Sequence, residues 1–266
     1  MADFLMTALR DRYLDLLEAA LIGTLYDDPS IAWWTDGSYR PELREKGNDI
    51  PRSAQTMIGH ARMRNLRQAC ETAILDNVPG DFLEAGVWRG GACIFMRGIL
   101  EAYGDTERRV FVADSFRGLP SPSPELYPAD VGDSQQVAEI YQRAHALKEL
   151  AVSRQLVADN FRRYGFLDER VVFLEGWFKD TLPQAPIDRL AVLRLDGDMY
   201  ESTIQIFESC YYKVSRGGAV IVDDYGAFPS CARATTDFRT QHGITSPIQP
   251  IDDTGVWWQV DHEPIN

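Results

Sequence analysis

The 266-residue sequence contains few cysteines and histidines, and neither type is spaced for metal binding. The four cysteines lack both the paired spacing of zinc ligands and the density of a secreted disulfide scaffold: Cys70, Cys93, Cys210 and Cys231. The four histidines share no ligand spacing with each other or with the cysteines. We therefore expect reduced, mostly buried thiols rather than a zinc centre.

Basic residues are also in deficit, with 27 Lys and Arg against 40 Asp and Glu and a formal net charge of −13. Nucleic-acid binding needs a basic patch, so we expect no nucleic-acid partner.

Long apolar runs are missing too. Residues 1–25 place apolar residues at helical spacing between charges, which predicts an amphipathic helix and neither a signal peptide nor a membrane span. We expect no membrane partner and a cytoplasmic location.

Three common catalytic or cofactor motifs are missing. Without a G-x-S-x-G elbow or a P-loop, serine hydrolysis and phosphoryl transfer are disfavoured. The G-x-G-x-x-G spacing that seats a pyrophosphate is also missing, because Glu84, Gly86, Gly90 and Gly91 form E-x-G-x-x-x-G-G between an apolar strand and a helix. This pattern favours a cofactor without phosphates, such as S-adenosylmethionine, and a purely structural glycine turn is the alternative.

Apolar runs and helical patterns alternate along the rest of the chain. They predict an α/β fold with a Rossmann-like, doubly wound and mostly parallel sheet, whose ligands lie at the carboxyl ends of the strands. We expect strands at 81–85, 110–113, 171–174, 190–195 and 218–222, a final edge strand at 255–260, and helices at 56–76, 91–103, 147–164 and 202–212.

One domain of residues 1–266 is the simplest organisation for a chain of this length. Residues 1–55 would form an N-terminal helix and a covering arm, and residues 56–266 the catalytic core. An insertion at 118–146 begins with four prolines within eleven residues, which excludes a helix or a central strand there. It is either a lid over the site or an ordinary surface loop.

Acidic pairs end two of the expected strands, Asp196 with Asp198 and Asp223 with Asp224. Four carboxylates at neighbouring strand ends can hold a hard divalent cation, whereas two solvated acidic loops are the alternative. Asp196 and Asp198 would face the same way in an extended chain. Asp223 and Asp224 can reach one ion only if the chain turns after the strand.

Another acid, Asp114, ends the strand at 110–113, where a ribose diol could be held. The aromatic residues are harder to assign, because tryptophan fills cores and interfaces more often than it contacts ligands. Trp177 could line an adenine or belong to the core, and the same choice applies to Trp33, Trp34, Tyr39, Trp257 and Trp258. Lys179 and Arg194 are expected in salt bridges rather than as catalytic cations.

Six motifs in order resemble the macrocin O-methyltransferase family over nearly the whole chain: 56–59, 80–84 with 90–95, 113–116, 176–181, 195–198 and 222–225. The resemblance implies a Mg²⁺-dependent S-adenosylmethionine methyltransferase that acts on antibiotic deoxysugars. Within the family the sequence looks most similar to the aminocoumarin branch, whose member methylates the 4-hydroxyl of noviose in novobiocin biosynthesis.

Carried onto this sequence, the resemblance makes Asp196, Asp223 and Asp224 the metal ligands and Asp198 the general base. For the cofactor, the resemblance and the local chemistry agree on Glu84 and Gly86 in the first turn and on Asp114 at the ribose, with Ser115 beside it. The other expected cofactor residues are Met57, Ile58 and Gly59 at the methionine end, Gly176 and Trp177 at the adenine, and Asp196.

The expected acceptor is therefore a sugar hydroxyl of a glycosylated antibiotic precursor. Three alternatives stay open: a macrolide deoxysugar methyltransferase, a metal-dependent catechol-type O-methyltransferase, and a cofactor-binding scaffold without turnover. The N-terminal helix and aromatic arm also favour a homodimer, because exposed apolar faces usually find a partner.

Overall fold

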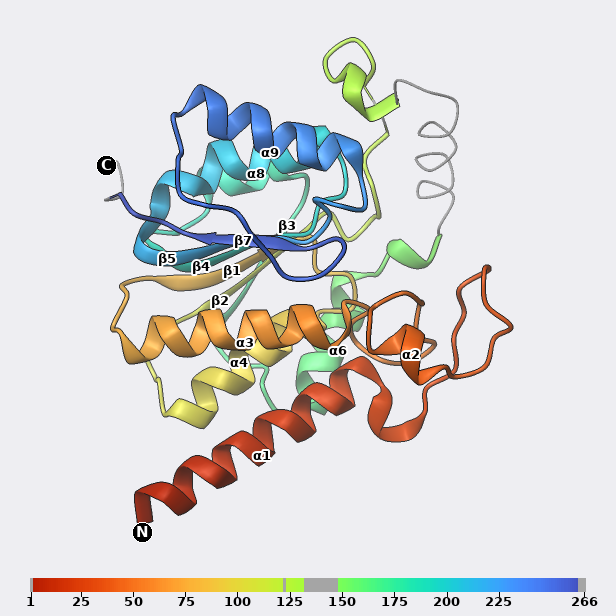
Figure 1. Cartoon of the computed structure of the whole chain (residues 1–266), viewed down its shortest axis with the longest axis vertical. Helices are drawn as coiled ribbons and strands as arrows, with labels where there is room; N and C mark the ends of the chain where they lie inside the picture. Colours follow the sequence, from red (N-terminus) through yellow and green to blue (C-terminus); the bar gives the residue numbers. More distant parts are fainter. Residues whose placement is uncertain (1, 122, 132–147, 263–266) are drawn as a thin grey trace.

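A seven-stranded sheet forms the centre of the computed structural model, which describes residues 2–121, 123–131 and 148–262 (Figure 1). The strand order is β3-β2-β1-β4-β5-β7-β6. Five strands are parallel: β1 (Asp81–Ala85), β2 (Val110–Asp114), β3 (Val171–Glu175), β4 (Leu190–Leu195) and β5 (Val214–Val222). Two are antiparallel: β7 (Val256–Gln259) and β6 (Gln249–Pro250).

The central strands read as short apolar runs because helices cover both faces of the sheet. Every residue of β4 is buried, including Arg194, the one charged residue in that strand. A charge in such a place must be compensated by partners. Its partners lie at the carboxyl edge of the sheet and belong to the site described below.

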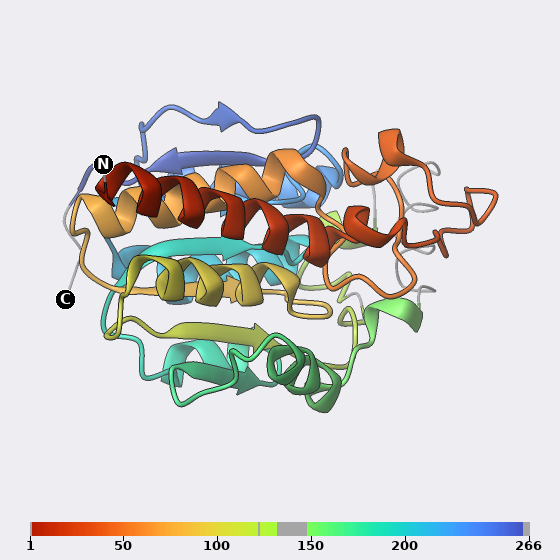
Figure 2. The same cartoon turned by 90° about the horizontal axis from the view of Figure 1, so that it is seen from below.

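Helices pack on both faces of the sheet (Figure 1). One face carries α3 (Gly59–Leu75), α4 (Gly91–Tyr103) and α6 (Arg154–Arg163), with α1 (Ala2–Ile22) outside α3 and α4 (Figure 2). The other carries α7 (Phe178–Thr181), α8 (Tyr200–Cys210) and α9 (Pro229–Gln241). The short helices are α2 (Pro41–Arg44) and the 3₁₀ turns η1 (Thr24–Tyr26), η2 (Pro128–Val131), η3 (Lys148–Leu150), η4 (Leu182–Gln184) and η5 (Tyr211–Lys213).

The predicted fold class is confirmed, and β1, β4 and α4 have the predicted bounds. The helix expected at 147–164 starts only at Arg154, because Ser153 accepts the Leu156 N–H and caps it; residue 147 lies outside the described residues. The segment 255–260 forms β7, but it is not the edge strand, since β6 pairs outside it. We did not predict α9.

The described parts of the proline-rich insertion, residues 118–121 and 123–131, contain the 3₁₀ turn η2 and neither strand nor α-helix. Residues 122 and 132–146 of the insertion fall outside the described residues. All four cysteines are buried and free, as the sequence predicted. Within the described chain we find no helix with the length and apolar character to cross a bilayer.

Candidate functional site

A cavity of about 810 Å³ lies at the carboxyl ends of β1, β2, β4 and β5. This is the edge at which ligands bind in open α/β sheets. The N-terminal arm contributes residues 47–50 to its wall, the insertion contributes Gly118–Ser121, and the turn before β7 contributes Thr254. Segments far apart in the sequence therefore enclose one space over the strand ends.

The turn between β1 and α4 comes very close to the end of β4. Gly86 has a left-handed φ of 89°, and a Cβ there would overlap the backbone carbonyl of Asp196. Only glycine tolerates both conditions. Gly86 thus brings the expected cofactor turn against the acidic segment after β4.

Asp114 is fixed on the cavity wall at the end of β2. Its carboxylate accepts N–H bonds from Val87 at 2.8 Å and from Phe116 at 2.7 Å. Burial raises the pKa of Asp114, and the two N–H donors oppose that rise. Ser115, which also lines the cavity, accepts from the Arg117 N–H and donates to the Gly118 carbonyl at the start of the insertion.

Most of the expected cofactor residues share this wall: Met57, Ile58, Glu84, Gly86, Asp114, Ser115, Trp177 and Asp196. Gly59 and Gly176 are not among its described lining residues. Gly59, with φ 71°, lets the start of α3 touch the backbone of residues 45–47, and Gly176, with φ 143°, packs against Thr181. Both glycines serve backbone packing next to the site.

Replacing Asp114 with alanine is expected to weaken S-adenosylmethionine binding by about tenfold or more, because the carboxylate that we expect to hold the ribose diol is lost. Calorimetry of cofactor binding measures this, with circular dichroism to confirm the fold. An unchanged dissociation constant would place the cofactor elsewhere in the cavity.

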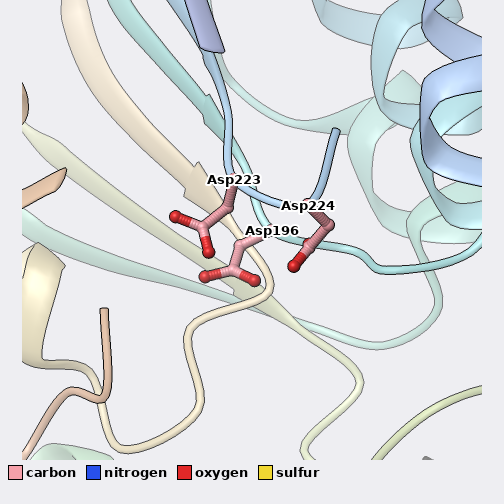
Figure 3. Close-up of side chains that lie close together, drawn as sticks. All are labelled: Asp196, Asp223 and Asp224. Atoms are coloured by element: carbon pink, nitrogen blue, oxygen red, sulfur yellow. The ribbon is translucent and has the colours of Figure 1, made fainter. Parts of the chain in front are cut away.

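Three carboxylates converge at the ends of β4 and β5 (Figure 3). One oxygen from each of Asp196, Asp223 and Asp224 lies within 4.8 Å of the others. The strand β5 ends at Val222 and the chain bends at once, so Asp223 and Asp224 reach the same point. The turn that the metal-site hypothesis required is therefore present.

Asp198 lines the same cavity, but the extended geometry expected for 196–198 is wrong. Asp198 has a left-handed φ of 58°, and its backbone N–H donates to Asp224 Oδ2 at 3.2 Å. The segment turns here because α8 starts at Tyr200 and requires a change of direction after β4. Asp198 stands beside the three-carboxylate cluster without being one of its members.

Two arginines contact the cluster. Arg194 is fully buried and donates to Glu84 Oε1 at 2.5 Å, to Asp196 Oδ2 at 2.7 Å, and to Asp223. Arg62, from α3, pairs with Asp223 and with Asp252, the latter at 3.1 Å. The salt-bridge role expected for Arg194 is confirmed, and Lys179 likewise pairs with Asp180.

Negative charge still exceeds positive charge in the site. Five carboxylates line the cavity here: Glu84, Asp196, Asp198, Asp223 and Asp224. Among the described residues, their ion pairs come only from Arg62 and Arg194, while Lys179, which also lines the cavity, pairs with Asp180. Burial first, and then repulsion between the carboxylates, raises the pKa of both Asp198 and Asp224. A bound divalent cation would relieve this repulsion.

The donor set therefore fits a hard cation. Asp196, Asp223 and Asp224 offer only oxygen atoms, which suit Mg²⁺ or Ca²⁺ better than a soft metal. Arg194 forms ion pairs with two of these three carboxylates, Asp196 and Asp223, and such outer-shell partners commonly orient metal ligands. Asp224 has no such arginine contact in the described chain, and its carboxylate is buried.

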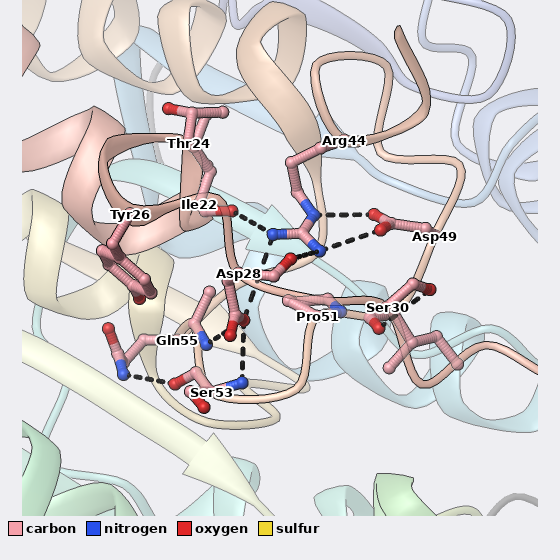
Figure 4. A network of polar contacts seen from close by, with 12 residues as sticks. Ile22, Thr24, Tyr26, Asp28, Ser30, Arg44, Asp49, Pro51, Ser53 and Gln55 are labelled. Atoms are coloured by element: carbon pink, nitrogen blue, oxygen red, sulfur yellow. Dashed lines mark hydrogen bonds and ion pairs between the residues drawn. The ribbon is translucent and has the colours of Figure 1, made fainter. Parts of the chain in front are cut away.

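A buried polar network holds the N-terminal arm in place (Figure 4). The Arg44 guanidinium binds both oxygens of Asp49, at 2.7 and 2.8 Å, and the carbonyls of Ile22 and Asp28. Asp28 in turn accepts the N–H groups of Ser53 and Ala54. Because this network is fully hydrogen-bonded, it ties the end of α1 to the arm and fixes the wall at residues 47–50.

Some of the aromatic residues line the cavity and others belong to the core, and the sequence had left this choice open. Trp34 lines the cavity half-exposed, and its indole N–H donates to the Asn48 carbonyl at 3.1 Å, which fixes the ring. Trp177 also lines the cavity, whereas Trp258 is buried in the core between the sheet and α8. Sequence reasoning predicted a covering arm but did not single out its wall residues 47–50, and it missed Arg62 and Thr254, since none of them belongs to a recognisable motif.

Comparison of the sequence with known proteins identifies its family. The family model for macrocin O-methyltransferase (TylF) matches residues 10–260. Demethyldecarbamoylnovobiocin O-methyltransferase of Streptomyces niveus is 50% identical over 93% of this chain and 92% of its own length. The mycinamicin III 3''-O-methyltransferase of Micromonospora griseorubida is 46% identical over 93% and 95%.

A third relative, from Streptomyces olivaceus, is a 4'-O-methyltransferase of a rhamnosyl-tetracenomycin C, 48% identical over 94% of this chain and 93% of its own. Among solved structures, the O-methyltransferase NovP superposes with a TM-score of 0.84 at 48% identity, over 95% of this chain and 100% of NovP. The chain therefore belongs to the macrocin O-methyltransferase family and is an O-methyltransferase.

Proposed function

We propose that this protein is a Mg²⁺-dependent, S-adenosylmethionine-dependent methyltransferase of a deoxysugar hydroxyl on a glycosylated antibiotic precursor. The favoured acceptor is the 4-hydroxyl of noviose in a novobiocin-type aminocoumarin. One observation carries the proposal: Asp196, Asp198, Asp223 and Asp224 meet on one cavity wall, directly beside the Gly86 turn.

The chemistry explains why a cation and a base are needed together. A sugar hydroxyl is a very weak acid, so its deprotonation at neutral pH needs both positive charge nearby and a proton acceptor. When bound, a divalent cation supplies charge that stabilises the developing alkoxide, and S-adenosylmethionine supplies an activated methyl group. Asp196, Asp223 and Asp224 would hold the cation.

The chain's own residues do the rest. Asp198 accepts the hydroxyl proton, because it lines the cavity beside the three ligands and its backbone N–H, which donates to Asp224, fixes its position there. Arg194 fixes the orientation of Asp196 and Asp223. The arm and the insertion contribute to the cavity walls, which would help to orient the acceptor hydroxyl toward the cofactor and limit the access of water.

The acceptor is supported by the relatives, whose names cite novobiocin, tetracenomycin and mycinamicin derivatives at 50%, 48% and 46% identity. The aminocoumarin is favoured because the novobiocin enzyme has the highest identity of the three.

An acceptor panel tests the proposal. Desmethyl aminocoumarin, rhamnosyl-tetracenomycin and macrolide glycosides are compared with a simple catechol under identical cofactor and Mg²⁺ concentrations. We expect the aminocoumarin glycoside to show the highest kcat/KM and the catechol to be inert. Preferred turnover of the catechol would favour the catechol-type alternative. Cofactor binding without turnover of any acceptor would favour the non-catalytic scaffold.

We also propose that the protein is a homodimer that uses the outer face of α1. Leu5, Leu9, Tyr13 and Leu16 follow one helical stripe and are exposed, and Leu9 and Leu16 remain more than half accessible. Such a stripe is usually covered by a partner. Analytical ultracentrifugation is expected to give twice the chain mass, and a monomer at micromolar concentration would contradict the proposal.

A further inference from the structure

The insertion reaches the acidic loop through one buried carboxylate. Asp130, in η2, is only 1% exposed. Its two oxygens accept the backbone N–H groups of Tyr200 at 2.5 Å and of Glu201 at 2.9 Å. These are the first two residues of α8, so a residue some seventy positions earlier supplies the cap of this helix.

The capped helix carries the acidic segment at its start. Met199 precedes α8 and contributes no side-chain cap, so within the described chain Asp130 is the side chain that satisfies these first N–H groups. Asp198 lies two residues before Tyr200, in a left-handed conformation that any shift of the helix start would disturb. Glu201, Ser202 and Gln205 on the first turns of α8 line the cavity.

A second contact joins the segment that follows the insertion to the cofactor turn. The Trp88 indole N–H donates to the Glu149 carbonyl at 2.9 Å, and Trp88 itself has a left-handed φ of 48°. Tyr127 of the insertion also lies against Tyr200, with ring centroids 6.1 Å apart. Residues 127–130 of the insertion therefore contact the start of α8, and Glu149, which follows the insertion, contacts the turn after β1.

We infer that Asp130 is a positioning residue for methyl transfer, which couples the seating of residues 123–131 of the insertion to the placement of Asp198 and the first turn of α8. The inference rests on the proposed function for its kinetic readout. Its structural basis is independent of the acceptor, since it depends only on the bidentate contact between Asp130 and α8. The alternative is an ordinary helix cap that contributes stability alone.

Two variants and a matched control separate these roles. Asp130→Ala removes both acceptors, whereas Asp130→Asn keeps one carbonyl oxygen. Asp105 provides the control, because its Oδ1 also accepts two backbone N–H groups, from Glu107 and Arg108, both at 3.0 Å. It precedes β2, at the amino end of the sheet and away from the cavity. Asp105→Ala therefore removes a similar pair of N–H contacts, together with an ion pair to Arg108, without touching the site.

We expect Asp130→Ala to lower kcat/KM for the acceptor by about tenfold or more, because small misplacements of a base have large kinetic effects. Asp130→Asn is expected to fall between Asp130→Ala and the wild type. Cofactor affinity stays unchanged in both, and Asp105→Ala keeps wild-type kcat/KM even where its Tm falls. Equal kinetic losses in Asp130→Ala and Asp105→Ala, or no loss in either, would overturn the inference.

Hydrogen–deuterium exchange of the same proteins, without acceptor, keeps the test independent of the proposed function. Faster exchange confined to residues 118–131 and 198–204 in Asp130→Ala is expected. Unchanged exchange in these peptides would overturn the coupling, even in an active enzyme. By contrast, a wild-type protein that methylates no glycoside would contradict the proposed function, and the exchange result alone would then decide whether the coupling exists.

Discussion

Replacing Asp198 with asparagine is expected to lower kcat by about 10²–10⁴-fold, the usual contribution of a positioned general base. The asparagine side chain has nearly the same shape but cannot accept the proton at neutral pH. The backbone N–H of residue 198 can still donate to Asp224, so the loop is kept. Because a base acts mainly in the transition state, cofactor affinity is expected to change little.

Steady-state kinetics and cofactor calorimetry together test this prediction. Asp188→Asn provides a matched control, since Asp188 is exposed before β4, at the opposite edge of the sheet from the cavity. It should keep wild-type kcat. Near-normal turnover of Asp198→Asn would leave proton removal to another group and remove Asp198 from the account.

Replacing Asp196 with asparagine is expected to weaken divalent-cation binding by at least about tenfold, since even outer-shell changes commonly have that effect. The amide of the new side chain would still offer an oxygen to Arg194, so the fold is retained. The loss of one charged ligand leaves Asp223, already paired with two arginines, and Asp224. The Mg²⁺ concentration required for half-maximal activity should rise in parallel.

Titration with Mn²⁺ followed by electron paramagnetic resonance measures this affinity without an acceptor. Circular dichroism and cofactor binding show whether the variant is folded. The same Mn²⁺ affinity in Asp196→Asn and in the wild type would exclude Asp196 as a ligand.

The sheet could be predicted from the sequence because its strands are short apolar runs with clear boundaries. Asp81–Ala85 and Leu190–Leu195 have the expected limits for this reason. The helix α9 was missed because its sequence is rich in Ser, Thr and Arg, and only a few residues such as Ala234 and Phe238 mark its buried face. The β6 edge was missed because it pairs over only two residues.

The acidic cluster could also be predicted, because the carboxyl ends of parallel neighbours meet at one edge. Its surroundings could not. Arg62 comes from α3, 161 residues before Asp223, and no local pattern links the two. The left-handed φ of Asp198 depends on how α8 begins, and that start is capped by Asp130 from the insertion. Such contacts between distant segments have no signature in a single sequence.

Methyl transfer from labelled S-adenosylmethionine to desmethyl aminocoumarin glycoside, with Mg²⁺ and then with EDTA, tests the central claim most directly. We predict a methylated sugar in the presence of Mg²⁺, loss of product with EDTA, and recovery when Mg²⁺ is restored in excess. Equal product formation in EDTA would contradict the metal-dependent account of the Asp196, Asp223 and Asp224 cluster.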